Sequence, residues 1–207
     1  SATVTFKCID PEVESIVMWK TQRVDIETRL DKMDYSFAYN DAFLQAVVNN
    51  EDWYLFDLVE APKVHDAFYV LKATEYNEVV SQAIDAGKKF KKLKARDLLK
   101  SVLIARNETG RVYSINVTRV NEHTPFTDVV RLSNLCQEVT LPTKAYKNMQ
   151  DLYAEESEAE TAFCTLSAIN VAKVSFTEYE HIASVALKAV DLMIDKAPMM
   201  TTSMKNS

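Results

Sequence analysis

The sequence predicts an α/β fold, because segments with the alternation typical of strands are separated by segments with helical spacing. Residues 2–6 and 111–117 are examples of the first kind, and residues 88–107 of the second. Of the 207 residues, 47% are hydrophobic and 26% are charged, which is typical of a globular protein. The net charge of -6 offers no broad basic surface for nucleic acid, and no run of apolar residues is long enough to predict a membrane span.

The first half of the chain predicts short elements in alternation. Val4 and Phe6 share one face of the first predicted strand, and Pro11 opens a helix that continues to Trp19. Residues 21–32 are polar and predict a loop. Beyond it we expect a helix over 37–48, a strand over 53–58 and helices over 64–70 and 75–84.

The middle of the chain predicts an amphipathic helix over 88–107, which Gly110 can close, followed by the strand at 111–117. This helix begins with five lysines, at 88, 89, 91, 92 and 94. They could bind phosphate or form a solvated helix face, and the apolar spacing favours the solvated face.

The last third predicts an extended run over 134–141 that Pro142 stops, a polar surface excursion over 146–160 and an apolar return over 163–171. A capping box of Thr177 and Glu180 begins a helix that runs to about residue 195. The residues expected on its buried face are Ile182, Val185, Ala186, Ala189, Val190 and Met193.

The candidate chemistry lies in the extended run. Side chains alternate along a strand, so Asn134, Cys136 and Glu138 are expected on one face, roughly 7 Å apart. An amide can hold a hydroxyl group, a carboxylate can accept its proton, and a sulfur between them can do redox or nucleophilic work. The alternative is that Cys136 is a small buried hydrophobic residue, and spacing alone does not exclude it.

The other cysteines and the histidines limit the remaining options. Cys8, Cys136 and Cys164 are too few and too scattered for a disulfide scaffold and indicate a reducing compartment. Cys8 falls on no motif, so we expect a buried structural residue. The three histidines are far apart in sequence, which predicts no metal site in this chain.

Four segments resemble class I ribonucleotide reductase large subunits. The two most specific are Ser-Asn-Leu-Cys-Gln-Glu-Val-Thr-Leu-Pro-Thr at 133–143, similar to the active-site loop of that family, and Phe-Cys-Thr-Leu-Ser-Ala-Ile-Asn at 163–170. The others are the stretch from Thr109 to Phe126 and Met-Asp-Tyr at 33–35, which follows Arg23 and Arg29. Cys8-Ile9-Asp10-Pro11 departs from a Trp-His pattern usual in the family, which affects local packing rather than the catalytic assignment.

The resemblance implies a fold and residue roles. Residues 1–207 would form the central part of a ten-stranded α/β barrel that lacks its upstream and downstream segments, with the radical cysteine on an inward loop. Cys136 matches the cysteine that becomes a thiyl radical and removes the ribose 3′-hydrogen. Glu138 matches the carboxylate that takes the 3′-hydroxyl proton, and Asn134 the amide that holds the substrate hydroxyl. Cys164 matches one of two cysteines that reduce the 2′-position.

The resemblance also implies partners. A ribonucleoside diphosphate would be reduced to its 2′-deoxy form, with the radical supplied by a metal-containing small subunit and the electrons by a thioredoxin- or glutaredoxin-type dithiol. The chain itself would bind no cofactor, act in the cytoplasm without membrane or nucleic acid, and join other segments of the same large subunit in a homodimer. Without those segments and the small subunit it would be inactive. The alternative is a non-catalytic homologue or assembly scaffold that keeps the fold; a cysteine within disulfide reach of Cys164 would argue against it.

Overall fold

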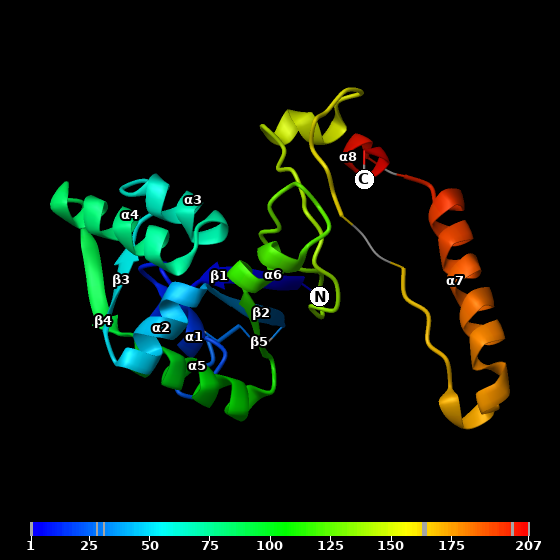
Figure 1. The fold of residues 1–207 in the computed structure, drawn as a ribbon, viewed down its shortest axis with the longest axis horizontal. Coiled ribbons are helices and arrows are strands. Elements are labelled where there is room, and N and C mark those ends of the chain that lie inside the picture. Colours follow the sequence, from blue (N-terminus) through cyan, green and yellow to red (C-terminus); the bar gives the residue numbers. More distant parts are fainter. Residues whose placement is uncertain (1, 28, 31, 163–164, 200, 207) are drawn as a thin grey trace. The chain divides into compact units, whose positions relative to one another are not determined.

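The structure, a computed structural model, describes residues 2–27, 29–30, 32–162, 165–199 and 201–206. The chain divides into two compact units, residues 1–142 and 143–207 (Figure 1). The first unit holds all five strands of the described chain and the sequence motif around Cys136.

A parallel three-stranded sheet organises the first unit. Its strands are β1 (Ala2–Lys7), β2 (Met33–Tyr39) and β5 (Val112–Asn116), in the order β1-β2-β5. Parallel neighbours need a crossover, and α1 (Val13–Met18) lies in the connection from β1 to β2. This arrangement confirms the α/β class expected from the sequence.

The central strand β2 was not predicted from the sequence pattern. The helix predicted over 37–48 is wrong at its start, because Phe37 belongs to β2 and the helix α2 spans Asp41–Asn49. The Asn40 side chain caps this helix by accepting a hydrogen bond from the Phe43 amide at 3.0 Å. Four consecutive residues of β2 are buried, so the strand lacks the polar–apolar alternation that identifies half-exposed strands.

A second, antiparallel sheet pairs β3 (Asp52–Phe56) with β4 (Phe90–Lys94), and the helices α3 (Pro62–Val70) and α4 (Ala73–Asp85) lie between these strands in sequence. The helix predicted over 88–107 is therefore wrong in its first part, since α5 spans only Ala95–Thr109. Gly110 ends this helix in the left-handed conformation, as predicted. A further short helix, α6 (Val117–His123), directly follows β5 and was not expected.

The lysines near residue 90 lie on β4 and in the turn before it rather than on a helix. Lys92 and Lys94 each form an ion pair with Asp52 across the two strands, at 2.9 and 2.8 Å, and their side chains are about half exposed. The solvated interpretation of these lysines is confirmed, although the element that carries them is a strand.

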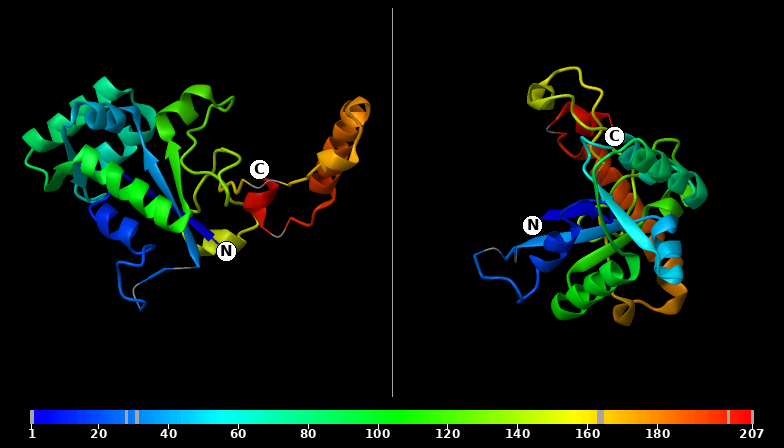
Figure 2. Two further views of the ribbon diagram at one scale, coloured as in Figure 1. Left: turned by 90° about the horizontal axis from the view of Figure 1, so that it is seen from below. Right: turned by 90° about the vertical axis from the view of Figure 1, so that its left-hand side faces the viewer.

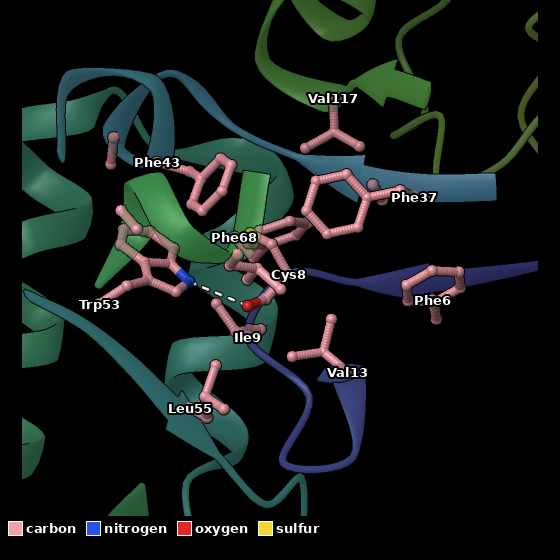
Figure 3. Packing of buried hydrophobic residues seen from close by; sticks show 14 of the residues in the cluster. Phe6, Cys8, Ile9, Val13, Phe37, Phe43, Trp53, Leu55, Phe68 and Val117 are labelled. Carbon is pink, nitrogen blue, oxygen red and sulfur yellow. Dashed lines mark hydrogen bonds between the residues drawn. The ribbon is translucent and has the colours of Figure 1, made fainter. Parts of the chain in front are cut away.

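The hydrophobic core of the first unit lies on one side of the parallel sheet. Aromatic rings of β1, β2 and α2 meet there, with Phe37 contacting Phe6 and Phe43 at centroid distances of 5.7 Å (Figure 3). Figure 2 shows the strands and helices that carry these rings from two further sides. Cys8 is fully buried in this cluster, and its carbonyl accepts a hydrogen bond from the Trp53 indole at 2.9 Å (Figure 3). The prediction that Cys8 is a buried residue is confirmed. Burial of each large side chain contributes about 1.5–3 kcal/mol to folding.

The second unit contains three short 3-10 helices, η1 (Met149–Tyr153), η2 (Val171–Lys173) and η3 (Phe176–Glu178), and the helices α7 (Tyr179–Lys196) and α8 (Thr202–Lys205). Lys144 and Glu160 form an isolated antiparallel bridge within it. The capping box that precedes α7 is formed by Ser175 and Glu178, two residues earlier than predicted.

The apolar stripe of α7 is exposed, in contrast to the prediction. No described residue of this helix is buried, and Val185 and Met193 are 51% and 59% exposed. An amphipathic helix buries its stripe only against another element, and within its own unit α7 packs chiefly on the short helix η3. Within the part of the chain that the structure describes, no helix combines the length and the apolar character needed to cross a membrane.

Candidate active site

The parallel sheet presents two different faces. In β2, Tyr35, Phe37 and Tyr39 point to the side where α2 packs, whereas Asp34 and Ser36 point to the other side. The strand register places Thr5, Ser36 and Tyr113 side by side, so β1 and β5 add polar groups to the same surface as Ser36. We call this surface, formed by Thr3, Thr5, Asp34, Ser36 and Tyr113, the polar face of the sheet.

The segment with the candidate catalytic residues forms a tight turn, so the prediction of an extended run over 134–141 is wrong. The Gln137 amide donates a hydrogen bond to the Asn134 carbonyl at 3.2 Å, and Gln137 has a positive φ of 60°. The Asn134 side-chain oxygen accepts a hydrogen bond from the Val139 amide at 3.1 Å, and the Asn134 amide donates to the Val139 carbonyl at 3.4 Å. Asparagine side chains often replace backbone partners in this way, and here the result is a closed turn.

The residues on either side of Cys136 bind two strands of the sheet. The Thr3 hydroxyl of β1 donates to the Leu135 carbonyl at 2.7 Å. The Gln137 side-chain amide donates to the Ser36 hydroxyl of β2. Between them, Cys136 lies near the phenol of Tyr113 in β5, close enough to raise the pKa of that phenol. The turn is therefore fixed on the polar face.

The electrostatics of Tyr113 show which groups surround the thiol. Partial burial raises the pKa of the Tyr113 phenol, and the neighbouring groups Cys136, Asp34 and Glu138 raise it further. The Tyr113 phenol is therefore uncharged at neutral pH, beside the thiol and the two carboxylates.

The structure brings together two of the four predicted site residues. Cys136 and Glu138 both lie near the Tyr113 hydroxyl, and both are exposed in this chain. Asn134 is half-buried, and its side-chain oxygen stabilises the turn instead of standing in line with the other two. Cys164 lies outside the described residues. The expected row on one face of a strand is therefore replaced by a cluster on a turn.

Sequence reasoning missed the residues that hold the turn, namely Thr3, Ser36 and Gln137, and the neighbouring Tyr113. The alternation of Thr3 and Thr5 with apolar neighbours in β1 was a signal for a polar sheet face. No local pattern identifies the turn that binds this face, because Ser36 on the sheet and Gln137 on the turn are 101 residues apart in the chain.

A cleft of about 600 Å³ lies close to the N-terminal ends of β2 and β5. Its lining residues are Lys20, Gln22, Arg23, Arg29, Glu108, Thr109 and Arg111. Arg23 pairs with Glu108 at 2.5 Å, and Arg111 lies 3.6 Å from Asp34, so carboxylates offset part of this positive charge. Among the residues that the structure describes, no three His, Cys, Asp or Glu side chains are grouped so that they could hold a metal ion.

The fold and the turn define a class of protein: an α/β domain that holds a cysteine thiol and a carboxylate on the polar face of a parallel sheet. Residues 1–207 match the sequence model of the family described as "Ribonucleotide reductase, barrel domain". The chain belongs to this family, and its parallel sheet with helices is part of an α/β barrel.

Curated relatives carry the name ribonucleoside-diphosphate reductase subunit alpha. The protein from Buchnera aphidicola subsp. Acyrthosiphon pisum is 30% identical over 201 residues, which covers 94% of this chain and 26% of the relative. The subunit alpha of Enterobacteria phage T4 is 27% identical over 202 residues, with the same coverage of both chains. For the reductase 1 subunit alpha of Escherichia coli K12, 32% identity extends over 147 residues, or 70% of this chain and 19% of the relative. The chain thus spans about a quarter of the length of the first of these relatives.

Proposed function

We propose that this chain supplies the radical-bearing part of a ribonucleoside-diphosphate reductase large subunit, which makes 2′-deoxyribonucleotides for DNA synthesis. The observation that carries the proposal is the placement of Cys136 and Glu138 on a hydrogen-bonded turn against the polar face of the sheet. In α/β barrels the helices lie outside, so the face opposite the one on which α2 packs is expected to line the interior. An inward loop with the radical cysteine is consistent with this geometry.

In the proposed reaction, the Cys136 thiyl radical removes the 3′-hydrogen atom of the ribose and becomes a thiol. Glu138 accepts the proton of the 3′-hydroxyl, and the 2′-hydroxyl leaves as water after it gains a proton. Cys164 and a second cysteine supply two electrons and two protons in total and end as a disulfide. Cys136 then returns the hydrogen atom to the 3′-carbon and is again a radical, so the net reaction consumes one dithiol.

Asn134 is proposed to bind the substrate hydroxyl through its amide group. Its side-chain oxygen already accepts a backbone hydrogen bond within the turn, which fixes the plane of the amide. The orientation of the Asn134 amide would then be set before the substrate binds. This lowers the entropic cost of placing the substrate hydroxyl for the reaction.

The proposed partners follow from the exposure of the thiol. Cys136 is exposed in this chain, whereas a sulfur radical must be kept from water and stray reductants. Other segments of the same large subunit would cover the polar face, and the assembled subunit would be a cytoplasmic homodimer. A metal-containing small subunit would generate the radical, and a thioredoxin- or glutaredoxin-type dithiol would reduce the disulfide.

The experiment is Cys136→Ser in the complete large subunit that contains this chain, assayed with its small subunit, a dithiol and a ribonucleoside diphosphate. Serine is nearly isosteric but cannot form the radical, so we expect no 2′-deoxynucleotide above background and an unchanged melting temperature. Cys8→Ala is the matched control and should retain turnover, because Cys8 lies in the core. Turnover in the Cys136→Ser protein would contradict the proposal.

The same assay tests the reducing pair and the rival interpretation. Cys164→Ser should block turnover that depends on added dithiol, and normal turnover would make Cys164 a structural residue. A non-catalytic homologue or assembly scaffold would show no reduction with wild-type protein under any of these conditions. The proximity of Cys136 and Glu138 on one turn favours the enzyme.

A further inference from the structure

The turn places Gln137 between the two groups that the proposed reaction uses. Cys136 and Glu138 are its neighbours in the chain and are exposed, whereas Gln137 is half-buried. In that reaction both groups act at one ribose carbon, since Cys136 removes its hydrogen atom and Glu138 takes the proton of its hydroxyl. The two side chains must therefore be aimed together, and the φ and ψ angles of Gln137 lie between them.

The backbone of Gln137 has a conformation that needs outside support. Its φ of 60° lies in the left-handed region, where a residue with a Cβ atom crowds its own backbone. In the described part of the chain, Asn50 is the other residue besides glycine with a positive φ, and it ends α2, where asparagine is common. Glutamine has no such preference, so contacts from the rest of the fold must hold residue 137.

The sheet supplies a contact to the Gln137 side chain. The side-chain amide of Gln137 donates a hydrogen bond to the hydroxyl of Ser36 in the central strand β2. Ser36 is fully buried, and a buried hydroxyl is normally hydrogen-bonded. On the other side of the thiol, the Thr3 hydroxyl donates to the Leu135 carbonyl at 2.7 Å. The strands β1 and β2 therefore hold the chain on both sides of Cys136.

We propose that Gln137 is a positioning residue, whose hydrogen bond to Ser36 holds the left-handed turn in which Cys136 and Glu138 are aimed at the same ribose carbon. The inference rests on the proposed function and adds Gln137 and Ser36 to that site. Without the bond, residue 137 can relax toward more common backbone angles. The two reacting groups would then be correctly oriented for a smaller fraction of the time, which lowers the rate without weakening substrate binding.

The test is a double-mutant cycle in the complete large subunit, assayed with small subunit, dithiol and a ribonucleoside diphosphate. Gln137→Met keeps the length of the side chain and removes the donor, and Ser36→Ala removes the acceptor. We expect each variant to lower kcat about three- to tenfold, as for one hydrogen bond, with unchanged KM. The double variant should lose no more than either single variant, because both changes break the same bond.

Two features of the experiment separate positioning from a loss of structure. Gln137→Met changes a half-buried side chain on a turn, so it should keep the wild-type melting temperature even if the buried Ser36→Ala change lowers it. The matched control is Ser114→Ala in β5. Ser114 is paired in register with Phe37, so it faces away from the turn, and this control should keep the wild-type kcat.

Four outcomes overturn the inference, and they separate it from the proposed function. If both single variants keep the wild-type kcat while Cys136→Ser is inactive, the positioning role is wrong and the function stands. If the loss in the double variant is the product of the two single losses, Gln137 and Ser36 act independently. If Gln137→Met lowers kcat only together with a raised KM or a lower melting temperature, Gln137 is structural. If Cys136→Ser remains active, the proposed function fails and the positioning role fails with it.

Discussion

The two free cysteines that the structure describes lie in opposite environments of the same unit. Cys8 is fully buried on the side of the sheet where the helices pack, and Cys136 is exposed on a turn over the polar face. Burial raises the pKa of the Cys8 thiol well above its ordinary value, so this sulfur stays protonated and unreactive. The comparison shows that the face of the sheet, rather than the residue type, decides whether a cysteine can do chemistry.

The difference between the two faces extends to what a substitution should change. Residues on the helix-covered side, such as Phe37 and Trp53, pack in the core and should affect the free energy of unfolding. Residues on the turn make few core contacts and should affect rates. A core substitution that lowers the rate of the folded protein, or a turn substitution that lowers the free energy of unfolding, would contradict the comparison.

The largest expected effect comes from the turn. Glu138→Gln keeps the shape of the side chain but removes its basicity, so kcat of the assembled reductase should fall by about 10²–10⁴-fold with little change in KM. Steady-state kinetics would measure this, with Glu14→Gln on the exposed surface of α1 as the matched control. A kcat within about a factor of two of wild type would show that Glu138 is not the base.

A smaller effect, on stability alone, is expected from the core cysteine. Cys8→Ser places a hydroxyl in the fully buried cluster beside Trp53, and an unpaired buried hydroxyl costs about 1–3 kcal/mol. Urea unfolding should report this loss, and turnover by the folded protein should be unchanged. Cys8→Ala, which adds no polar group, separates the cost of the hydroxyl from that of lost volume. Loss of turnover in either folded variant would give Cys8 a chemical role that the comparison denies.

The smallest expected effect is on the pH dependence of the free energy of unfolding, and it comes from His65, which contacts Lys7 at the end of β1. His65 of α3 is buried, its Nε2 donates to the Phe56 carbonyl at 2.7 Å, and its Nδ1 accepts from the Lys7 ammonium at 2.5 Å. Burial, together with the nearby Lys7 charge, lowers the pKa of His65, although the Phe56 carbonyl opposes the shift. The folded state therefore holds this imidazole neutral while the unfolded state binds a proton below its ordinary pKa of about 6.5.

Because the unfolded state takes up this proton, acid lowers the free energy of unfolding. The stabilisation by His65 is present above pH 6.5 or so and is lost as the pH falls through the lowered pKa of the folded state. Unfolding midpoints measured across this range should decrease more steeply toward acid for wild type than for His65→Gln, whose amide can still donate to Phe56. Parallel pH profiles for the two proteins would show that His65 does not titrate on unfolding.

Local patterns predicted most of the helices but failed where two strands depend on distant partners. β2 is buried on both faces, and β4 is a strand only because it pairs with β3, with Trp53 opposite Leu93. The predicted helices included the end of β2, residues 37–39, and all of β4, since a short apolar run carries little information about period. The apolar residues of α7 share one face as predicted, but they are not buried. The spacing of apolar residues predicts a face and does not identify the element that covers it.

The sequence by itself determined the α/β class, the buried position of Cys8 and the resemblance of the loop around Cys136 to a catalytic loop. These properties depend on residue type and on near neighbours, which a linear pattern preserves. Only the tertiary structure decided that Asn134 closes a turn, that Cys136 and Glu138 lie near Tyr113, and that β1 and β2 hold this turn. The reason is physical: hydrogen bonds that cross from one sheet strand to a loop about a hundred residues away depend on strand register, which is set by packing of the whole unit.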